Sequence, residues 1–525
     1  MWLALISVVV IGFLAYKLLS SSSKNFFKEH GIREIDTSKA VSQLDIFLGR
    51  KGLALADDYA YKTMGSDKFC GISEMGHNLI IIKDMELMKK ILIKDFDHFV
   101  DRRDFFSDAE ISFKKMLPSL KGDEWKGVRS SVSPTFSSGK IRRMMDCFNN
   151  VGIEWVNNFK EKAKASPDGS ATIEAMSSVN QYTIDVIASA VFGMQSGTIK
   201  NPQSPFATMA ARMSEPTKWQ LMKFTFFLQF PKLASKVMKI RIIDEEARTF
   251  FEGILEQGLK ARMSGSTTKR NDFLQLLVEA KKGELKAEGN DELNSFEKDA
   301  QIQGSESGEK KQWLTDQIMN SQSLVFFIAG FSTTSNAIIF AAYALAIHQD
   351  VQDRLRKEVS KIAKPDGSFD YDDLSTLVYM EMVLCEVLRK FPAAARLERK
   401  CVKDYKDSES GLFVPQGTTV GIPAYSIHCD PKYYENPDKF DPEHFSPEKK
   451  AERSPYAYMP FGIGPRNCIG MRFALVETKA ALAHLVNSFR IEPTKKTPIP
   501  AQGKWVGFGL LPPKGLELKL TPLTK

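Results

Sequence analysis

The residues best suited to chemistry lie in one short segment, Phe461-Gly-Ile-Gly-Pro-Arg-Asn-Cys-Ile-Gly470. Its cysteine, Cys468, lies between Gly464 and Gly470, and Arg466 precedes it by two residues. A cysteine binds iron as a thiolate, and a buried thiolate needs donors aimed at its sulfur. Glycines permit a tight loop whose backbone N–H groups turn toward that sulfur, and arginine supplies a fixed cation for an anionic group. A structural cysteine beside a Gly/Pro turn explains Cys468 alone, not the whole pattern.

This segment resembles the haem-binding signature F-x-x-G-x-R-x-C-x-G of the cytochrome P450 family. The resemblance implies a haem b cofactor with Cys468 as its axial thiolate ligand. A second family feature is W-x-x-x-R, matched by Trp125 and Arg129 on one helix face. By the same resemblance, the residues that contact the haem and its propionates are Phe461, Gly464, Arg466, Gly470, Trp125, Arg129, Arg102 and Arg399.

A helix-spaced pair, Glu386 and Arg389, matches the family's E-x-x-R, a buried ion pair that orders the haem-side core. Alone, such a pair is usually a surface contact worth a few tenths of a kcal/mol. Here it lies in the apolar run Leu384-Cys-Glu-Val-Leu-Arg389, which favours burial. The family's P-E-R-F motif stands as Pro442-Glu-His-Phe445, so His444 replaces an arginine that normally joins the pair. We interpret that replacement as a minor change.

The stretch Ala329-Gly-Phe-Ser-Thr-Thr334 lies within a long apolar helix. In the family, small residues such as Ala329 and Gly330 leave room for dioxygen, and a threonine, here Thr333, holds a water chain that delivers protons. Small residues in mid-helix also allow a close helix crossing, but the companion motifs favour the oxygen site. Ser332 stands where the family usually has an acid, and a serine relays a proton but cannot store one. The resemblance therefore implies slower or less tightly coupled oxygen activation, or another acid in that role.

The substrate chamber is predicted from segments that line it in the family. They supply Phe105, Phe106, Phe113, Phe326, Ala329, Gly330, Ala394, Ala395, Phe508 and Leu510. The 36 phenylalanines of the chain favour a lipophilic substrate only weakly, because most must belong to the core. Residues 219–230, rich in phenylalanine, either dip into a bilayer near the substrate entrance or form an interior helix.

The amino terminus is predicted to anchor the protein in a membrane. Residues 1–19 are almost continuously apolar and approach the length needed for one span. A cleavable signal peptide or a buried helix is the alternative, but no positive charge precedes the run. Lys17 lies near the end of the run, and Lys24 and Lys28 follow it, which favours a cytosolic catalytic domain. We expect an endoplasmic reticulum anchor at 1–19, a linker at 20–30 and a haem-thiolate domain at 31–525, with its haem loop at 461–470.

Composition and periodicity indicate a mainly α-helical globular protein with a minor β region. The 525 residues are 43% hydrophobic and 26% charged, which excludes a multi-span membrane protein and a wholly disordered chain. Apolar residues at three- and four-residue spacing predict helices over 141–163, 172–194, 243–262, 313–348 and 350–363. Strands are predicted at 78–83, 412–422 and 516–520, and a solvated loop at 283–312. Six scattered cysteines suit a reducing compartment.

The expected activity is insertion of one oxygen atom from dioxygen into a lipophilic molecule, a xenobiotic or an endogenous lipid or steroid. No nicotinamide or flavin motif is present, so the electrons must come from a partner. The resemblance implies NADPH-cytochrome P450 reductase, with cytochrome b5 as a second possible donor, and the net charge of +8 favours docking to an acidic face. The charge is spread without a nucleic-acid-binding pattern, so no nucleic acid partner is expected.

Two alternatives to a reductase-dependent monooxygenase remain. A haem-thiolate isomerase or dehydratase would act on hydroperoxides without a reductase, and Ser332 keeps that option open. A haem protein without turnover would only bind lipophilic molecules.

Overall fold

The computed structural model describes residues 26–47, 50–103, 110–214, 217–230, 233–265, 270–285, 313–501, 503–506 and 509–523. The predicted anchor at 1–19 and residues 20–25 of the predicted linker at 20–30 lie outside the described residues. So do most of the predicted loop at 283–312 and three chamber candidates, Phe105, Phe106 and Phe508.

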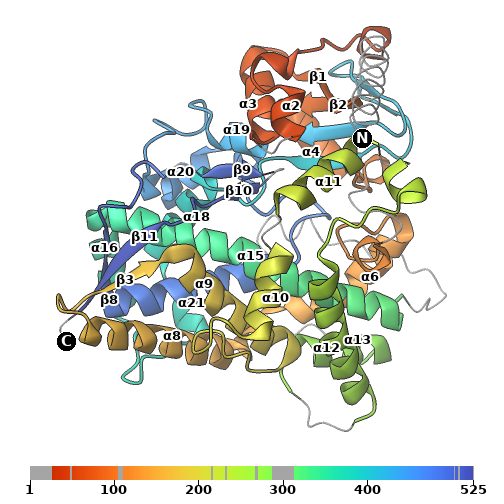
Figure 1. The fold of residues 1–525 in the computed structure, drawn as a ribbon. Helices are drawn as coiled ribbons and strands as arrows, with labels where there is room; N and C mark the ends of the chain where they lie inside the picture. The colour runs from red at the N-terminus through yellow and green to blue at the C-terminus, as the bar shows by residue number, and fades with distance from the viewer. Residues whose placement is uncertain are drawn as a thin grey trace, which may run out of the picture.

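Helices make up most of the fold (Figure 1). In chain order the α-helices are α2 (Gln43–Phe47), α3 (Ala54–Thr63), α4 (Met85–Lys89), α5 (Ile111–Lys114), α6 (Gly122–Val132), α7 (Ser138–Arg142), α8 (Met145–Ala165), α9 (Ala175–Ile187), α10 (Pro205–Ser214), α11 (Lys218–Gln229), α12 (Glu245–Met263), α13 (Phe273–Lys282), α15 (Asp316–Ile347), α16 (Gln349–Val359), α17 (Tyr371–Ser375), α18 (Val378–Lys390), α19 (Ala424–His428), α20 (Pro447–Glu452) and α21 (Met471–Ser488). The helices predicted from periodicity are confirmed, except that residues 171–174 of the predicted helix at 172–194 form a strand.

The central helix is α15, which packs against α9 and α21 (Figure 1). Its first turn is capped by Thr315, whose side-chain oxygen accepts a hydrogen bond from the Ile318 N–H at 3.2 Å. Among the described residues, α15 is the one helix long and apolar enough to cross a membrane, with a mean hydropathy of 1.7. Most of it is buried in protein, and a helix that is apolar all round belongs in a core.

The minor β region has four small sheets. The largest has the order β1 (Phe69–Glu74), β2 (His77–Ile82), β7 (Thr419–Ile422) and β4 (Leu397–Lys400), with β2 and β7 parallel and the other pairs antiparallel. A second sheet contains β3 (Ala171–Glu174), β11 (Glu517–Pro522) and β8 (Phe489–Pro493). The two-stranded sheets are β5 (Tyr405–Lys406) with β6 (Phe413–Val414), and β9 (Lys504–Val506) with β10 (Gly509–Leu511).

The predicted strands at 78–83 and 516–520 are confirmed by β2 and β11. The stretch predicted as one strand at 412–422 is two short strands, β6 and β7. Gly417 lies between them with a φ of +88°, a backbone turn that interrupts an extended strand. The two halves pair with different neighbours, β5 and β4, for that reason.

Candidate functional site

An enclosed cavity of about 510 Å³ lies beside Cys468 and α15. Its wall brings together segments that are far apart in the sequence. Residues predicted from the sequence that line it are Cys468, Phe461, Arg466, Gly470, Trp125, Arg129, Arg102, Arg399, Thr333, Phe326, Ala329, Gly330 and Ala394. The remaining wall is largely apolar, with side chains such as Leu117, Ile187 and Val325.

The loop that carries Cys468 is held by short backbone hydrogen bonds. The Cys468 N–H donates to the Phe461 carbonyl at 2.8 Å, and the Asn467 N–H donates to the Gly464 carbonyl at 2.9 Å. Gly464 has a φ of +76°, and a Cβ there would lie 2.1 Å from the Leu92 carbonyl oxygen. Gly470 has an ordinary φ of −88°, and a Cβ there would have Phe136 as its closest neighbour, at 3.8 Å. The two glycines of the motif therefore have different roles, and only Gly464 is required by the backbone.

Cys468 presents its sulfur to the cavity at the start of α21. Its side chain is open to the cavity but enclosed by the surrounding protein, so it is shielded from bulk solvent. Burial raises the pKa of the Cys468 thiol, while a hydrogen bond from the Gly470 backbone and the charges of Arg129 and Arg102 act in the opposite direction. These donors stabilise the Cys468 thiolate in part, and a metal cation at the sulfur would stabilise it further. The thiolate is the form of cysteine that binds metals.

Arg102, Arg129, Arg399 and Arg466 converge on the cavity wall from four segments. Arg102 Nη2 donates to the Arg466 carbonyl at 2.9 Å, and Arg129 donates to the Asn467 carbonyl at 3.0 Å and to its side-chain oxygen at 2.8 Å. Arg466 donates to the carbonyls of Val100, Leu117 and Leu120. Its guanidinium also stacks on the Trp125 ring, 4.0 Å from the ring centroid.

These four guanidinium groups carry more positive charge than their surroundings neutralise. Burial lowers the pKa of Arg129 to about 10, and burial with the charges of Arg102 and Arg399 lowers that of Arg466 to about 8. Burial lowers the pKa of Arg399 far below its usual value, and its Nε has no hydrogen-bond partner among the described residues. A buried cation needs an anion. The cluster therefore fits the carboxylates of a haem whose iron faces Cys468.

On α15, Thr333 and Ala329 face the cavity one turn apart, and the Thr333 hydroxyl donates to the Ala329 carbonyl at 2.7 Å. Gly330 lies against α9, where its missing side chain admits Ile187; a Cβ on Gly330 would lie 2.6 Å from Ile187 Cδ1. The close helix crossing and the opening to the cavity thus occur in the same short stretch. Ser332, in the same stretch, is not part of the cavity wall.

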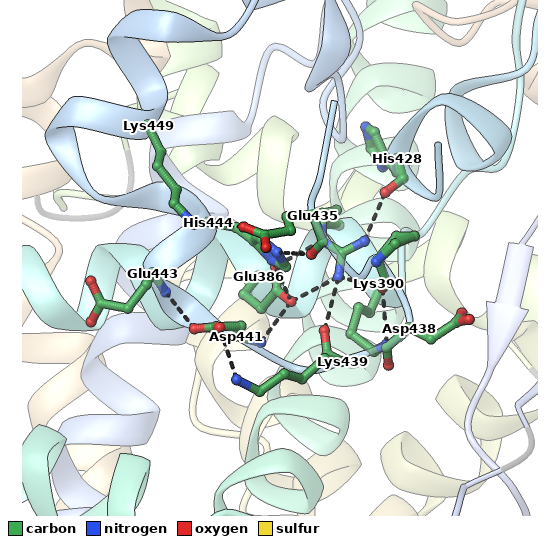
Figure 2. Close-up of polar contacts among 12 residues, drawn as sticks. Glu386, Lys390, His428, Glu435, Asp438, Lys439, Asp441, Glu443, His444 and Lys449 are labelled. Atoms are coloured by element: carbon green, nitrogen blue, oxygen red, sulfur yellow. Dashed lines mark hydrogen bonds and ion pairs between the residues drawn. The ribbon is translucent and has the colours of Figure 1, made fainter. Parts of the chain in front are cut away.

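Beneath the cavity, Glu386 and Arg389 form the buried ion pair that the sequence predicts, and both are fully buried (Figure 2). Arg389 also donates to the carbonyls of His428 at 2.7 Å and Pro437 at 2.8 Å. His444 lies next to the pair, with Nδ1 3.3 Å from the Glu386 carboxylate and Nε2 2.6 Å from the Glu435 carbonyl. Both ring nitrogens of His444 thus lie within hydrogen-bond distance of oxygen atoms.

Three chamber candidates do not lie on the cavity wall. Phe113 packs into the large hydrophobic core from the short helix α5 and is 3% exposed. Ala395 is 1% exposed beside Ala394, which does line the cavity. Leu510 of β10 packs against Gly503. In each case local packing directs the side chain into the protein interior.

Two charged residues on the wall were not singled out from the sequence. Arg396 and Glu398 flank Leu397 at the start of β4, and both are buried. Arg396 pairs with Asp57 and Glu74, which are more than 300 residues away, and Glu398 pairs with Arg103, which is 295 residues away. In the local sequence, only the alternation of charged and apolar residues in a short strand would indicate that Arg396 and Glu398 are buried on the cavity wall.

Comparison with known proteins agrees with the geometry of the site. The family model described as Cytochrome P450 matches residues 47–520. The chain is 34% identical to "Cytochrome P450 9e2" of Blattella germanica, over 100% of this chain and 98% of that protein. It is 35% identical to "Cytochrome P450 6a2" of Drosophila melanogaster, over 82% of each chain. It is 34% identical to "Cytochrome P450 3A11" of Mus musculus, over 90% of this chain and 88% of that protein.

The fold, the cysteine loop facing a cavity rimmed by arginines, and matches that span nearly the whole chain all agree. The family uses haem b with a cysteine thiolate as its axial ligand. The chain belongs to the cytochrome P450 family and is a monooxygenase.

Proposed function

We propose that this protein is a microsomal monooxygenase that oxidises lipophilic molecules with electrons from NADPH-cytochrome P450 reductase. The observation that carries the proposal is the cavity in which Cys468 and the four arginines meet a largely apolar wall. In this assignment Cys468 is the axial ligand, and Arg102, Arg129, Arg399 and Arg466 bind the propionates. When bound, the haem would supply the iron that activates dioxygen, and the Cys468 thiolate would donate electron density that favours O–O cleavage.

Residues of the cavity wall would position the substrate and move protons. Phe326, Ala329, Gly330 and Ala394 contribute apolar surface that favours a lipophilic substrate and excludes water. Thr333 donates its proton to the Ala329 carbonyl, which leaves its oxygen lone pairs free to accept a hydrogen bond from water in the cavity. Thr333 is therefore proposed to hold the water that delivers protons to the reacting oxygen. Ser332, off the cavity wall, would act only through intervening water.

Electrons are proposed to enter from a reductase, with cytochrome b5 as a second donor, through a basic surface. Exposed cations that would form it are Lys121, Arg142, Arg143, Lys449 and Lys450. Arg142 Nη2 forms an ion pair with Asp372 Oδ1 at 2.6 Å. Lys140 belongs to the same basic run but is buried, so we exclude it from the docking surface.

The proposed location is the endoplasmic reticulum membrane, with residues 1–19 as anchor, 20–30 as linker and the domain 31–525 in the cytosol. A second membrane contact is supported by apolar side chains that are exposed around the packed cluster of residues 41–56 and α11. They are Leu44, Trp219, Leu233, Val237 and Met238. Trp219 is 63% exposed at the start of α11, which favours bilayer contact over an interior helix for this part of 219–230.

Two measurements test the proposal. The carbon monoxide difference spectrum of the reduced protein should have the Soret band of a thiolate-ligated haem, and Cys468→His should lose it while retaining haem. Purified protein supplied with reductase, NADPH and dioxygen should consume NADPH in proportion to reductase. Turnover of a hydroperoxide alone, with no response to reductase, would instead establish the isomerase or dehydratase class. A thiolate-haem spectrum with neither reductase-dependent nor hydroperoxide turnover would indicate a protein that only binds lipophilic molecules.

A further inference from the structure

A cluster of five charged side chains lies at the edge of the cavity, on the side of the β1-β2-β7-β4 sheet. Arg396 donates to Asp57 of α3 at 2.7 Å, to Glu74 of β1 at 2.6 Å, and pairs with Glu398 of β4 at 2.8 Å. Arg103 pairs with Glu74 at 2.9 Å and with Glu398 at 2.7 Å. All five side chains are at least four-fifths buried. The cluster joins α3, two strands and the segment at Arg103 into one ionic network.

The cluster has more carboxylates than guanidinium groups. Asp57, Glu74 and Glu398 face Arg103 and Arg396, so these five side chains carry a net charge of −1 when all are ionised. The charge of Arg102, one of the four arginines assigned to the propionates, also acts on Glu398. Among the described residues, Asp57 Oδ2 and Glu398 Oε2 have no hydrogen-bond partner. A buried carboxylate oxygen without a donor is costly, whereas a carboxylic acid carries its own proton. The network is therefore built to hold a proton.

Asp57 is a carboxylate whose burial favours the protonated form. Burial raises its pKa to about 7, although Arg396 acts against the shift and Glu74 and Glu398 add to it. For Glu74, burial is outweighed by Arg396 and Arg103, which lower its pKa to about 2.

The other titratable group that faces Asp57 is Cys70 of β1. Burial raises the pKa of its thiol to about 12, with the Asp57 charge as the next cause, so Cys70 is neutral and leaves the charge of the network unchanged. On α3 itself, Asp58 instead pairs with Lys62 at 2.7 Å.

The network reaches the reaction chamber through Glu398. Of the described residues that line the cavity, Glu398 is the one carboxylic acid; the other ionisable groups of the wall are arginines and Cys468. Insertion of one oxygen atom of dioxygen consumes two electrons and two protons, because the second oxygen leaves as water. The electrons come from the redox partner, and the protons must cross this wall. Four arginines of the wall are assigned to binding the haem propionates, the fifth, Arg396, is paired with carboxylates, and the Ser332 hydroxyl does not store a proton.

We propose that Asp57 and Glu398 form a proton store that supplies the cavity during oxygen activation. Asp57 passes its proton through water to the Glu398 carboxylate, Glu398 gives it to water in the cavity, and solvent reprotonates Asp57. Arg396, bonded to both acids, holds them in place and stays charged throughout. Asp57 acts through Glu398 and is a positioning and storage group. This inference rests on the proposed monooxygenase function.

The test uses Asp57→Asn in the full-length holoprotein. Asparagine keeps an oxygen acceptor for Arg396 but has no titratable proton, and it leaves the remaining network neutral. With NADPH and NADPH-cytochrome P450 reductase, and no added substrate, the measured quantities are NADPH oxidation and the hydrogen peroxide released per NADPH. In the wild type, the fraction of NADPH electrons that reduce dioxygen to water, not to hydrogen peroxide, should fall as the pH rises through about 7. Asp57 loses its proton in that range. Asp57→Asn should lose that step and slow water formation by up to about 100-fold.

Matched variants separate proton storage from structure. Glu398→Gln should have the same effect, and the double variant no larger one, since both acids serve one path. Asp57→Glu should restore the pH step. Asp58→Asn, one residue along α3, should behave as wild type. An unchanged carbon monoxide spectrum in each variant shows that the haem site has folded.

A readout independent of turnover is the infrared band of a protonated carboxylic acid. It should titrate near pH 7 in the wild type and be absent from Asp57→Asn. A pH profile of Asp57→Asn that matches the wild type, or an Asp57 already ionised at pH 6, would overturn the inference. If the wild type itself oxidises no NADPH, the proposed function fails, and the infrared titration still decides whether the store exists.

Discussion

The Arg389 guanidinium donates two parallel hydrogen bonds to the Glu386 carboxylate one turn away on α18, from Nε at 2.7 Å and Nη2 at 2.8 Å. The same guanidinium reaches the backbone carbonyls of His428 and Pro437, and it packs over the Tyr434 ring. One side chain thus ties α18 to the long segment that leads to the cysteine loop. The pair contributes to the site by holding the chain beneath it.

Removing one member of that pair should therefore destabilise the protein strongly. Arg389→Met leaves the Glu386 carboxylate buried without its partner and should reduce the free energy of unfolding by about 3–5 kcal/mol. The control is Arg354→Met, which breaks a half-exposed pair with Glu443 worth about 0–1 kcal/mol. Urea unfolding followed by circular dichroism measures both. Equal losses in the two variants would contradict the assigned role of the buried pair.

The two glycines that frame Cys468 should respond differently to alanine. Gly464→Ala puts a side chain at a φ of +76° and against the Leu92 carbonyl, so it should cost at least about 1–2 kcal/mol from the backbone alone. Gly470→Ala meets no close neighbour and should retain the fold and the haem. Haem content of the purified proteins and their thermal midpoints measure the difference. Tolerance of alanine at Gly464 would contradict this geometry.

Arg129 is expected to contribute to haem affinity through charge. Arg129→Met removes a buried cation from the group of four and should weaken haem retention by roughly 10- to 100-fold, as for the loss of one charge-assisted hydrogen bond worth about 1.5–3 kcal/mol. Lys126→Met, on the same helix but paired with Asp97 at the surface, is the matched control. Transfer of haem to apomyoglobin gives the dissociation rate. The prediction fails if both variants lose haem at the wild-type rate.

Acid should destabilise the fold through two buried histidines. Burial lowers the pKa of His428 to about 3 and that of His484 to about 4, from 6.5 for an exposed imidazole. Below pH 6.5 both histidines become protonated in the unfolded chain but stay neutral in the folded chain. The free energy of unfolding therefore falls as the pH drops toward 3. Above pH 6.5 neither histidine adds any pH dependence.

His428→Gln should flatten that slope while keeping a side-chain acceptor for the Met459 N–H. His484→Gln provides a second variant, since it removes the other buried histidine and should also flatten the slope. Urea midpoints measured between pH 4 and 7 test both variants, and an equally steep slope in His428→Gln would exclude this residue as the cause.

Local patterns in the sequence predicted the parts of this protein that are built from neighbouring residues. Helical spacing located α8, α12, α15 and α16, because an apolar stripe on a helix must be buried somewhere. The apolar run around Glu386 and Arg389 predicted burial of the pair, since three residues along a helix return to one face. The cysteine loop was recognisable because its glycine and arginine spacing is local too.

Contacts between distant segments were decided only by the tertiary structure. Arg102, Arg129 and Arg399 meet Arg466 only because α6, β4 and the cysteine loop pack around one cavity. The same packing turns Phe113 into the core, buries Lys140, and brings Asp57 to Arg396 across 339 positions of the chain. The free energy of such contacts depends on which side chains share a dry interior. Which side chains are buried together depends on how whole helices and strands pack against one another. The residue order within one helix or strand does not predict that packing.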